Sequence, residues 1–364
     1  MLYGLENTQS EVAQQLEALL NAGDFPASVL FSGPAYSGRM FAALCVAKFL
    51  GSDTDSTIII SDRSYSFRIA SAVKLYRKAK NKAACNFLYS NVSTYLKQFH
   101  GALLDSQSPA NRKKFAGAGE CMDLLDELKK SDESSADKIA DRLEKALTGL
   151  SFTKSSPATV NQIRDIKAWS STSSLDGKAK VVIIEGLENS SDSTVNALLK
   201  TLEEPPEDTH FILISSNPGR IPATILSRVR HFRFNAFTEK EKNFVLNQLF
   251  VNASEYSDLE SFFLSYSGVD DNLLSLSAKA LASSEKIDLP TLVKELERTQ
   301  AWDRFYSLVL KNIVENYESG KISRRACSYI CSEINNAVSK GKAFNQVNRL
   351  TFDFVVFRTK EVLS

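Results

Sequence analysis

The sequence predicts an α/β fold: a parallel β-sheet with helices on both faces, followed by helical domains. Short apolar runs of strand length are separated by stretches with helical spacing, as in parallel sheets that are buried on both sides. The first run leads directly into a Gly-Pro turn and an apolar helix. After Phe234 the strand signals stop and the remaining sequence has a helical pattern.

The elements follow one another along the chain. Apolar residues at helical spacing predict a helix over residues 5–22 and a second one over residues 39–50. The strand candidates are the continuous apolar runs at 28–31, 57–60, 180–184 and 211–214. A long polar segment with a helical pattern, residues 63–150, separates the second run from the third. Relative to a minimal α/β core, this segment is an insertion.

A chain of 364 residues favours two or three domains over one. The end of the strand signals and the Ser/Asp/Pro-containing stretch near residues 283–290 suggest where they divide. We expect an α/β domain over residues 1–235, which includes the insertion, and two helical domains over residues 236–285 and 286–364.

The composition excludes several classes of protein. A net charge of +1 gives no support for gripping nucleic acid with the whole surface. The five cysteines lack a Cys-x-x-Cys pair and the three histidines lack metal-ligand spacing, so neither a disulfide scaffold nor a metal site is expected. The sequence has no secretory signal and no apolar run of the ~18 residues that span a membrane. We therefore expect a cytoplasmic protein without membrane contact.

The turn from Gly33 to Met40 has the spacing of a P-loop, G-x-x-x-x-G-K-[ST], between a strand and a helix. In a working P-loop, backbone N–H groups and the lysine hold phosphates, and the Ser/Thr hydroxyl binds Mg²⁺. Here Gly33 and Gly38 are kept, but Arg39 replaces the lysine and Met40 the hydroxyl. A thioether is a poor ligand for Mg²⁺. Taken alone, the pattern also fits a tight turn with no nucleotide role.

A P-loop ATPase needs a second motif in which a strand ends in Asp-Glu, for metal binding and for activation of the attacking water. The run at 180–184 ends in Glu185-Gly186. Glu185 supplies a carboxylate at the first position, whereas Gly186 has no side chain to act as a base. The sequence therefore predicts that this site hydrolyses no ATP and holds no cofactor or metal.

The stretch from Val195 to Pro206, VNALLKTLEEPP, has apolar residues on one helical face and ends in a double proline. This motif resembles the corresponding helix of the clamp-loader family of AAA+ proteins, whose bacterial members are subunits of DNA polymerase III. The resemblance continues through residues 211–217, the sensor 1 strand, to Ser227-Arg228-Val229, which matches the family's Ser-Arg-Cys motif. It also includes Gly4-Leu5-Glu6 and residues 30–34. It is specific over residues 1–60 and 155–235 and weak beyond them.

The resemblance implies an AAA+ domain followed by a lid (236–285) and a collar domain (286–364). It assigns Arg228, with Ser227, as an arginine finger that acts in trans on ATP held by a neighbouring subunit. Arg230 and Arg233 could share that electrostatic role. A sensor 2 arginine is missing from residues 267–273. The implied nucleotide site is degenerate and consists of Gly33, Gly38, Arg39, Met40, Glu185, Gly186 and Asn217.

A kept finger beside a degenerate site is typical of the non-catalytic delta-prime type of this family. The partners that the resemblance implies are gamma/tau and delta subunits, with transient contact to the sliding clamp and primed DNA. Family members often carry a four-cysteine zinc module between the nucleotide motifs. Only Cys85 and Cys121 lie there in this chain, so zinc is not expected. Apolar residues at helical spacing in the collar region are compatible with packing against sister subunits: Phe305, Leu308, Val309 and Ile313.

Three alternatives stay open at this stage. Arg228 could be an ordinary solvated arginine. Arg39 and Glu185 could serve an ATP-binding, gamma/tau-like ATPase in altered roles. The insertion begins with a basic run that could contact DNA or an acidic partner, or could form the solvated face of a helix. Its members are Arg63, Arg68, Lys74, Arg77, Lys78, Lys80 and Lys82.

Overall fold

The structure is a computed structural model that describes residues 4–63, 65–104, 109–131, 133–150, 157–172, 178–248, 256, 258–343 and 346–363. The chain divides into two compact units, Met1–Glu260 and Ser261–Ser364. In the described ranges, no helix is both long and apolar enough to cross a membrane.

A parallel five-stranded sheet forms the centre of the first unit, with the strand order β2-β3-β4-β1-β5. The strands are β1 (Ser28–Ser32), β2 (Thr57–Ser61), β3 (Lys180–Glu185), β4 (Thr209–Ser215) and β5 (Arg230–Arg233). The first four confirm the predicted runs. The fifth was not predicted because only Phe232 in the sequence RHFR is buried, as is usual for a charged strand at the edge of a sheet.

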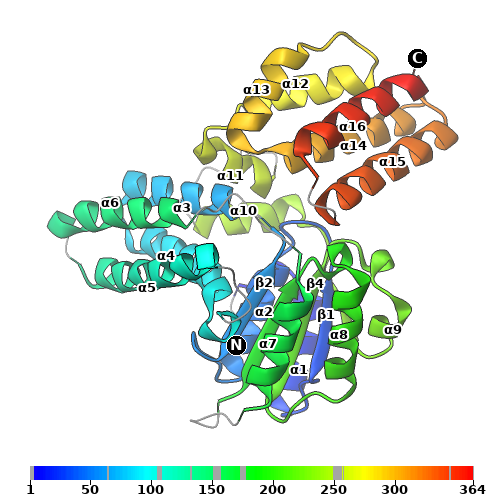
Figure 1. Cartoon of the computed structure of the whole chain (residues 1–364). Coiled ribbons are helices and arrows are strands. Elements are labelled where there is room, and N and C mark those ends of the chain that lie inside the picture. The colour runs from blue at the N-terminus through cyan, green and yellow to red at the C-terminus, as the bar shows by residue number, and fades with distance from the viewer. Residues whose placement is uncertain are drawn as a thin grey trace. The chain divides into compact units, whose positions relative to one another are not determined.

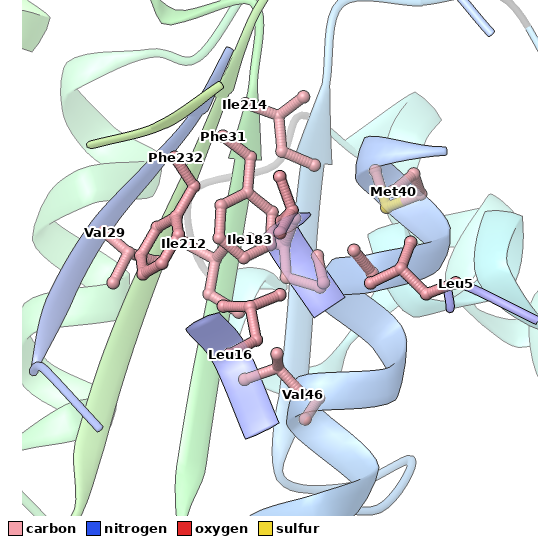
Figure 2. Packing of buried hydrophobic residues seen from close by; sticks show 14 of the residues in the cluster. Leu5, Leu16, Val29, Phe31, Met40, Val46, Ile183, Ile212, Ile214 and Phe232 are labelled. Atoms are coloured by element: carbon pink, nitrogen blue, oxygen red, sulfur yellow. The ribbon is translucent and has the colours of Figure 1, made fainter. Parts of the chain in front are cut away.

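Helices cover both faces of the sheet (Figure 1). On one face lie α1 (Ser10–Asn21) and α2 (Arg39–Phe49), and on the other α7 (Val160–Ser170) and α8 (Asp192–Glu203). Along β1, Val29 and Phe31 pack with α1 and α2, whereas Leu30 packs with α7 and α8. Figure 2 shows Phe31 and Phe232 packed above Leu16 and Val46. The predicted α/β class is confirmed.

The insertion is a group of four helices, α3 (Ser66–Ala79), α4 (Lys82–Leu96), α5 (Pro109–Lys130) and α6 (Glu133–Gly149). Helix α3 packs against α4 and α6, and α5 packs against α4 and α6 (Figure 1). Apolar side chains of these helices are buried, among them Leu88, Leu125 and Leu143. Two short 3₁₀ segments, η1 (Lys97–Phe99) and η2 (Gly101–Leu103), contact β2 and α7 respectively.

Two residues of the basic run form ion pairs within this helical group. Arg77 on α3 lies 2.6 Å from Asp141 and 2.5 Å from Glu144, both on α6, and Lys80 lies 2.6 Å from Asp137. All five of these cations are exposed, including Lys74, Lys78 and Lys82. These ion pairs favour the interpretation of the run as a solvated helix face that helps to hold α3 against α6.

The second unit is helical. After α10 (Glu239–Gln248) in the first unit and α11 (Leu259–Ser267) at the boundary come α12 (Asp271–Ala282), α13 (Leu289–Thr299), α14 (Trp302–Glu318), α15 (Arg324–Ala343) and α16 (Asn348–Leu363). Helix α12 packs on α14 and α16. The separation into a lid over 236–285 and a collar over 286–364 stays a prediction.

The apolar residues of α14 do not form an outer surface. Phe305, Val309 and Ile313 are fully buried and Leu308 is 8% exposed, all within this chain. The interpretation that these residues pack against sister subunits is therefore wrong. Helical periodicity identifies an apolar face, but it does not distinguish a partner in the same chain from one in another.

The side chain of His100 joins the insertion to the central sheet. Its Nδ1 accepts a hydrogen bond from the N–H of Ala102 (3.1 Å), so Nε2 carries the proton and donates to the carbonyl oxygen of Asp55 (2.7 Å). The ring also packs edge-on against Trp169. Burial lowers the pKa of His100 below its ordinary value, although the nearby Asp55 opposes this shift.

We expect the free energy of unfolding to fall as the pH is lowered from 7.5 to 5.5. Below the unfolded-state pKa of about 6.5, the unfolded chain takes up a proton that folded His100 resists, so stability is lost. The variant His100→Gln should lose less stability over this range. The measurement is urea denaturation at several pH values. Identical pH slopes for the two proteins would contradict this role of His100.

Candidate functional site

The turn between β1 and α2 keeps the path of a P-loop, but the surrounding chain fixes it. Gly33 has φ +152°, and a Cβ at this position would come closer than 3.0 Å to the carbonyl oxygen of Phe234. Gly38 has φ +87° and directly precedes α2. Each glycine is therefore required by backbone geometry, whether or not a phosphate binds.

A residue that the sequence did not single out holds this turn from outside. Gln9 is buried, and its Nε2 donates hydrogen bonds to the carbonyl oxygens of Ser37 (3.3 Å) and Asn235 (2.7 Å). Its Oε1 accepts one from the N–H of Asn235 (3.2 Å). The turn is thereby tied to the chain that follows β5.

Met40 takes no part in the polar edge of the site. Its side chain is 9% exposed and belongs to the apolar cluster between the sheet and the helices α1 and α2. Figure 2 shows it among the buried side chains of that cluster, together with Leu5. The position that carries a metal-binding hydroxyl in a working P-loop is thus part of the hydrophobic core.

The charged centre of the site lies at the carboxyl ends of the strands. Glu185 ends β3 and is 7% exposed. Its Oε1 lies 2.8 Å from Nε of Arg63, and its Oε2 accepts a hydrogen bond from Oγ of Ser61 at 2.8 Å. Both carboxylate oxygens therefore have partners from the end of β2.

Arg39 completes this group of charges. It is 4% exposed, and its Nη2 donates to Oγ of Ser216 at 3.1 Å, the same oxygen that accepts from Nη2 of Arg63 at 2.6 Å. Among the residues that the structure describes, its buried Nη1 has no hydrogen-bond partner. Burial, helped by the charge of Arg63, lowers the pKa of Arg39 to about 10, and Glu185 and Glu188 only partly oppose it.

The environment of Arg63 shifts its pKa in the opposite direction. Burial by itself would lower the pKa of Arg63, but the carboxylates of Glu185 and Asp62 outweigh burial and raise the pKa above its ordinary value. The pair Arg63–Glu185 is therefore the main electrostatic contact of the site, and Arg39 is the cation with the less favourable surroundings.

The position expected for the catalytic base is filled from another strand. Gly186 has φ +83°, and a Cβ there would overlap the carboxyl group of Asp62. Asp62 itself is buried and accepts a hydrogen bond from Nδ2 of Asn189 at 2.6 Å. No side chain at position 186 fits while Asp62 occupies this place.

Asn217, which the sequence predicts at the sensor 1 position, follows β4 at the same edge. Its N–H donates to Oε1 of Glu188 (3.3 Å) and to Oγ of Ser215 (3.0 Å), and the N–H of Ser216 also donates to Oε1 of Glu188 (3.0 Å). The structure thus brings Arg39, Glu185, Gly186 and Asn217 to one edge. The sequence reasoning missed four residues of this edge: Asp62, Arg63, Glu188 and Ser216. Each closely follows a predicted parallel strand, which was an available signal, because the carboxyl ends of such strands share an edge.

Arg228 is exposed in the loop between α9 (Ala223–Leu226) and β5. Its Nη2 lies 2.6 Å from Oε1 of Glu203, the last residue of α8. Its Nη1 donates to the carbonyl oxygen of Thr224 (2.8 Å) and to Oγ of Ser227 (3.2 Å). The contacts of Arg228 in the described part of the chain are therefore with this loop and α8, not with the residues of the glycine turn.

A parallel sheet, a P-loop-spaced turn before α2 and a buried carboxylate at the end of β3 define an α/β fold of the P-loop type. Residues 82–238 match the family described as DNA polymerase III, delta subunit. This part of the chain is therefore similar to clamp-loader subunits of DNA polymerase III, and the curated relatives carry the same family name.

Several curated proteins are similar to this chain. The tau subunit of DNA polymerase III from Escherichia coli is 33% identical over 146 residues, which cover 39% of this chain and 23% of tau. The delta' subunit from Buchnera aphidicola subsp. Baizongia pistaciae is 33% identical over 122 residues, 32% of this chain and 36% of that subunit. The delta' subunit from Haemophilus influenzae is 35% identical over 101 residues, 26% of this chain and 31% of that subunit. The chain thus matches well under two thirds of each relative's length.

A crystal structure of a DNA polymerase III gamma subunit-related protein from Thermotoga maritima aligns with 96% of this chain and 100% of its own. The sequence identity is 15% and the TM-score is 0.41, which is too low to establish a shared fold.

Gly186→Ala should destabilise the protein much more than Gly51→Ala. Both glycines have φ near +80°, where an L-residue costs roughly 1–2 kcal/mol, but a Cβ at Gly51 meets nothing within 4 Å. Overlap with Asp62 should add about 1–3 kcal/mol for Gly186→Ala. Chemical denaturation measures both variants, and Asp62→Ala in the Gly186→Ala background should recover part of the loss. Equal losses for the two single variants would show that the site is not filled by Asp62.

Proposed function

We propose that this chain is a non-catalytic, delta-prime-type subunit of the DNA polymerase III clamp loader. It is not an enzyme on its own, and it supplies Arg228 in trans to ATP bound by a neighbouring gamma/tau-type subunit. With gamma/tau and delta subunits as partners, it would help to place the sliding clamp on primed DNA. The observation that carries the proposal is the contrast between Glu185, whose two oxygens both have partners inside the chain, and the exposed Arg228.

The residues at the glycine turn do not fit Mg-ATP. A hydroxyl ligand for Mg²⁺ is replaced by Met40, which is packed in the core. The one acid of the second motif, Glu185, is engaged by Arg63 and Ser61. The place of the base at position 186 is filled by Asp62. The ligand for Mg²⁺ and the base that would activate water are thus both missing, each for a separate reason. This supports a site without ATP hydrolysis.

Arg228 has the chemistry of an arginine finger. A guanidinium is planar, permanently charged and able to donate two parallel hydrogen bonds to phosphate oxygens, so it stabilises charge that develops on a γ-phosphate. Its side chain is 34% exposed and lies at the surface of the first unit. The match of residues 82–238 to the family includes this loop.

A surface for assembly is available in the second unit. Helix α16 and the residue before it expose an apolar stripe: Val347 (66% exposed), Leu350 (63%), Phe354 (40%) and Phe357 (62%). The spacing of three, four and three residues is that of a coiled-coil seam. We assign this stripe, in place of the buried face of α14, as the contact with a helix of a neighbouring gamma/tau-type subunit.

Isothermal titration calorimetry of the purified chain should give no saturable, Mg²⁺-dependent heat with ATP. The reason is that Met40 offers Mg²⁺ no hydroxyl and that both carboxylate oxygens of Glu185 are engaged by Arg63 and Ser61. Saturable Mg²⁺-dependent binding would instead support the alternative of an ATP-binding, gamma/tau-like subunit that uses Arg39 and Glu185 in altered roles.

Arg228→Ala should lower ATP hydrolysis by a reconstituted clamp loader and leave its assembly intact. Removing a finger costs about 10³-fold or more at the site that it serves, so the loader should lose that site's share of the total rate. Steady-state ATPase assays and size-exclusion chromatography measure the two properties. Arg220→Ala, which removes another exposed arginine near this loop, is the matched control. An unchanged rate for Arg228→Ala would refute the assignment of the finger.

Leu350→Glu with Phe357→Glu should prevent co-assembly with the gamma/tau-type subunit, because two charges would be buried in the seam. The fold should survive, since both side chains are exposed in this chain. The control is Leu276→Glu, which places a charge at an isolated exposed leucine of α12 (69% exposed). Gel filtration of mixed subunits and circular dichroism are the measurements. Normal assembly of the double variant would rule out the stripe as the contact.

A further inference from the structure

Arg228 is held by three contacts within its own chain, with Glu203, Thr224 and Ser227. Its Nη2 pairs with Oε1 of Glu203 at 2.6 Å, and its Nη1 donates to the carbonyl oxygen of Thr224 at 2.8 Å. The side chain of Ser227 steadies the same loop, since its Oγ donates to the carbonyl oxygen of Thr224 (3.1 Å) and accepts from Nη1 of Arg228. The guanidinium therefore has a defined resting position before any neighbour is present.

The location of Glu203 strengthens this contact. Glu203 is the last residue of α8, where the helix dipole places partial negative charge. A cation at this end is favoured by the dipole and by the carboxylate together. Glu204 follows as the C-cap, and the Pro205-Pro206 pair after it prevents the helix from continuing, so the position of the Glu203 carboxylate relative to the loop is restricted.

The resting contact is also easy to exchange. The side chains of Glu203 and Arg228 are 46% and 34% exposed, and ion pairs of this kind contribute little net free energy in water. A γ-phosphate presented by a neighbouring subunit has more negative charge and accepts two hydrogen bonds from a guanidinium. Nη2 could then move from Glu203 to the phosphate while Nη1 keeps its bond to Thr224.

We propose that Glu203 is a positioning residue that holds Arg228 in a resting state and competes with the neighbour's phosphate for it. The proposal rests on the function proposed above, because it concerns the same arginine finger. Once ATP is bound, its γ-phosphate outcompetes Glu203 for Arg228, so kcat does not depend on Glu203. The competition still weakens the apparent affinity of the neighbouring site for ATP.

The test uses a reconstituted loader in which only the gamma/tau-type subunit next to this chain keeps a working nucleotide site. Glu203→Gln keeps the shape of the side chain and removes its charge. It should lower KM for ATP by up to about fivefold, the range open to an exposed ion pair, and leave kcat unchanged. In the Arg228→Ala background the same substitution should have no effect on KM.

Glu204→Gln is the matched control, because Glu204 is the adjacent exposed glutamate and has no ion pair within the described part of the chain. It should behave as the unmodified protein. A KM for Glu203→Gln that equals the control or rises above the unmodified value would overturn the proposal, as would an effect that persists without Arg228.

A second measurement separates the resting contact from the finger. In the isolated full chain, NMR of labelled arginine side chains should show slow rotation of the Arg228 guanidinium, and Glu203→Gln should make it faster. Equal rotation in the two proteins would refute the resting contact whatever the ATPase results. A clear difference, together with an unchanged ATPase rate for Arg228→Ala, would leave the contact standing and reject only the finger.

Discussion

The ion pair between Arg63 and Glu185 holds together the edge of the sheet where a nucleotide would bind. Glu185 is buried at the end of β3, and a buried carboxylate without a partner costs about 3–5 kcal/mol. The guanidinium that compensates it comes from the segment after β2, and the same guanidinium shares Ser216 with Arg39 of α2. One contact thus joins β2, β3, β4 and α2 at their polar ends.

The cations at this edge of the sheet differ from those of an ATPase. In an ATPase the cations at such an edge are a lysine and a metal ion, and their occupancy varies with the nucleotide. Here the positive charges are two arginines that belong to the chain, and their counter-charges are permanent. Under the proposed function, the edge would keep one arrangement whatever the nucleotide concentration. Such constancy suits a subunit whose proposed contribution is made at Arg228, on a different loop.

The sequence predicted the sheet where burial is complete and failed where it is partial. The strands at 28–31, 57–60, 180–184 and 211–214 are continuous apolar runs, so their pattern is unambiguous. Strand β5 has one buried side chain out of four and gives no such pattern. On α14 the helical periodicity was predicted correctly. The predicted contact of its apolar face with sister subunits was wrong, because that face packs inside this chain. The stripe on α16 escaped notice because that helix is apolar on more than one side.

At the site, the missing functional groups could be recognised from the sequence. The side chains that take their place could not. Met40 and Gly186 lack the required functional groups, and that is visible in the letters alone. The engagement of Glu185 by Arg63, a residue 122 positions earlier, depends on the register of β2 against β3. The filling of position 186 by Asp62 has the same cause. Contacts between neighbouring parallel strands are set by topology, which a single sequence does not specify.

The crowding of Gly186 by Asp62 has a consequence for the history of the protein. A substitution that put a carboxylate back at position 186 would first meet the side chain of Asp62 and unfold part of the site. A carboxylate at position 186 would need a prior change at position 62, and that change alone would leave Asn189 without its hydrogen bond to Asp62. Each single step towards a carboxylate at position 186 therefore passes through a less stable protein, so packing alone keeps glycine at this position.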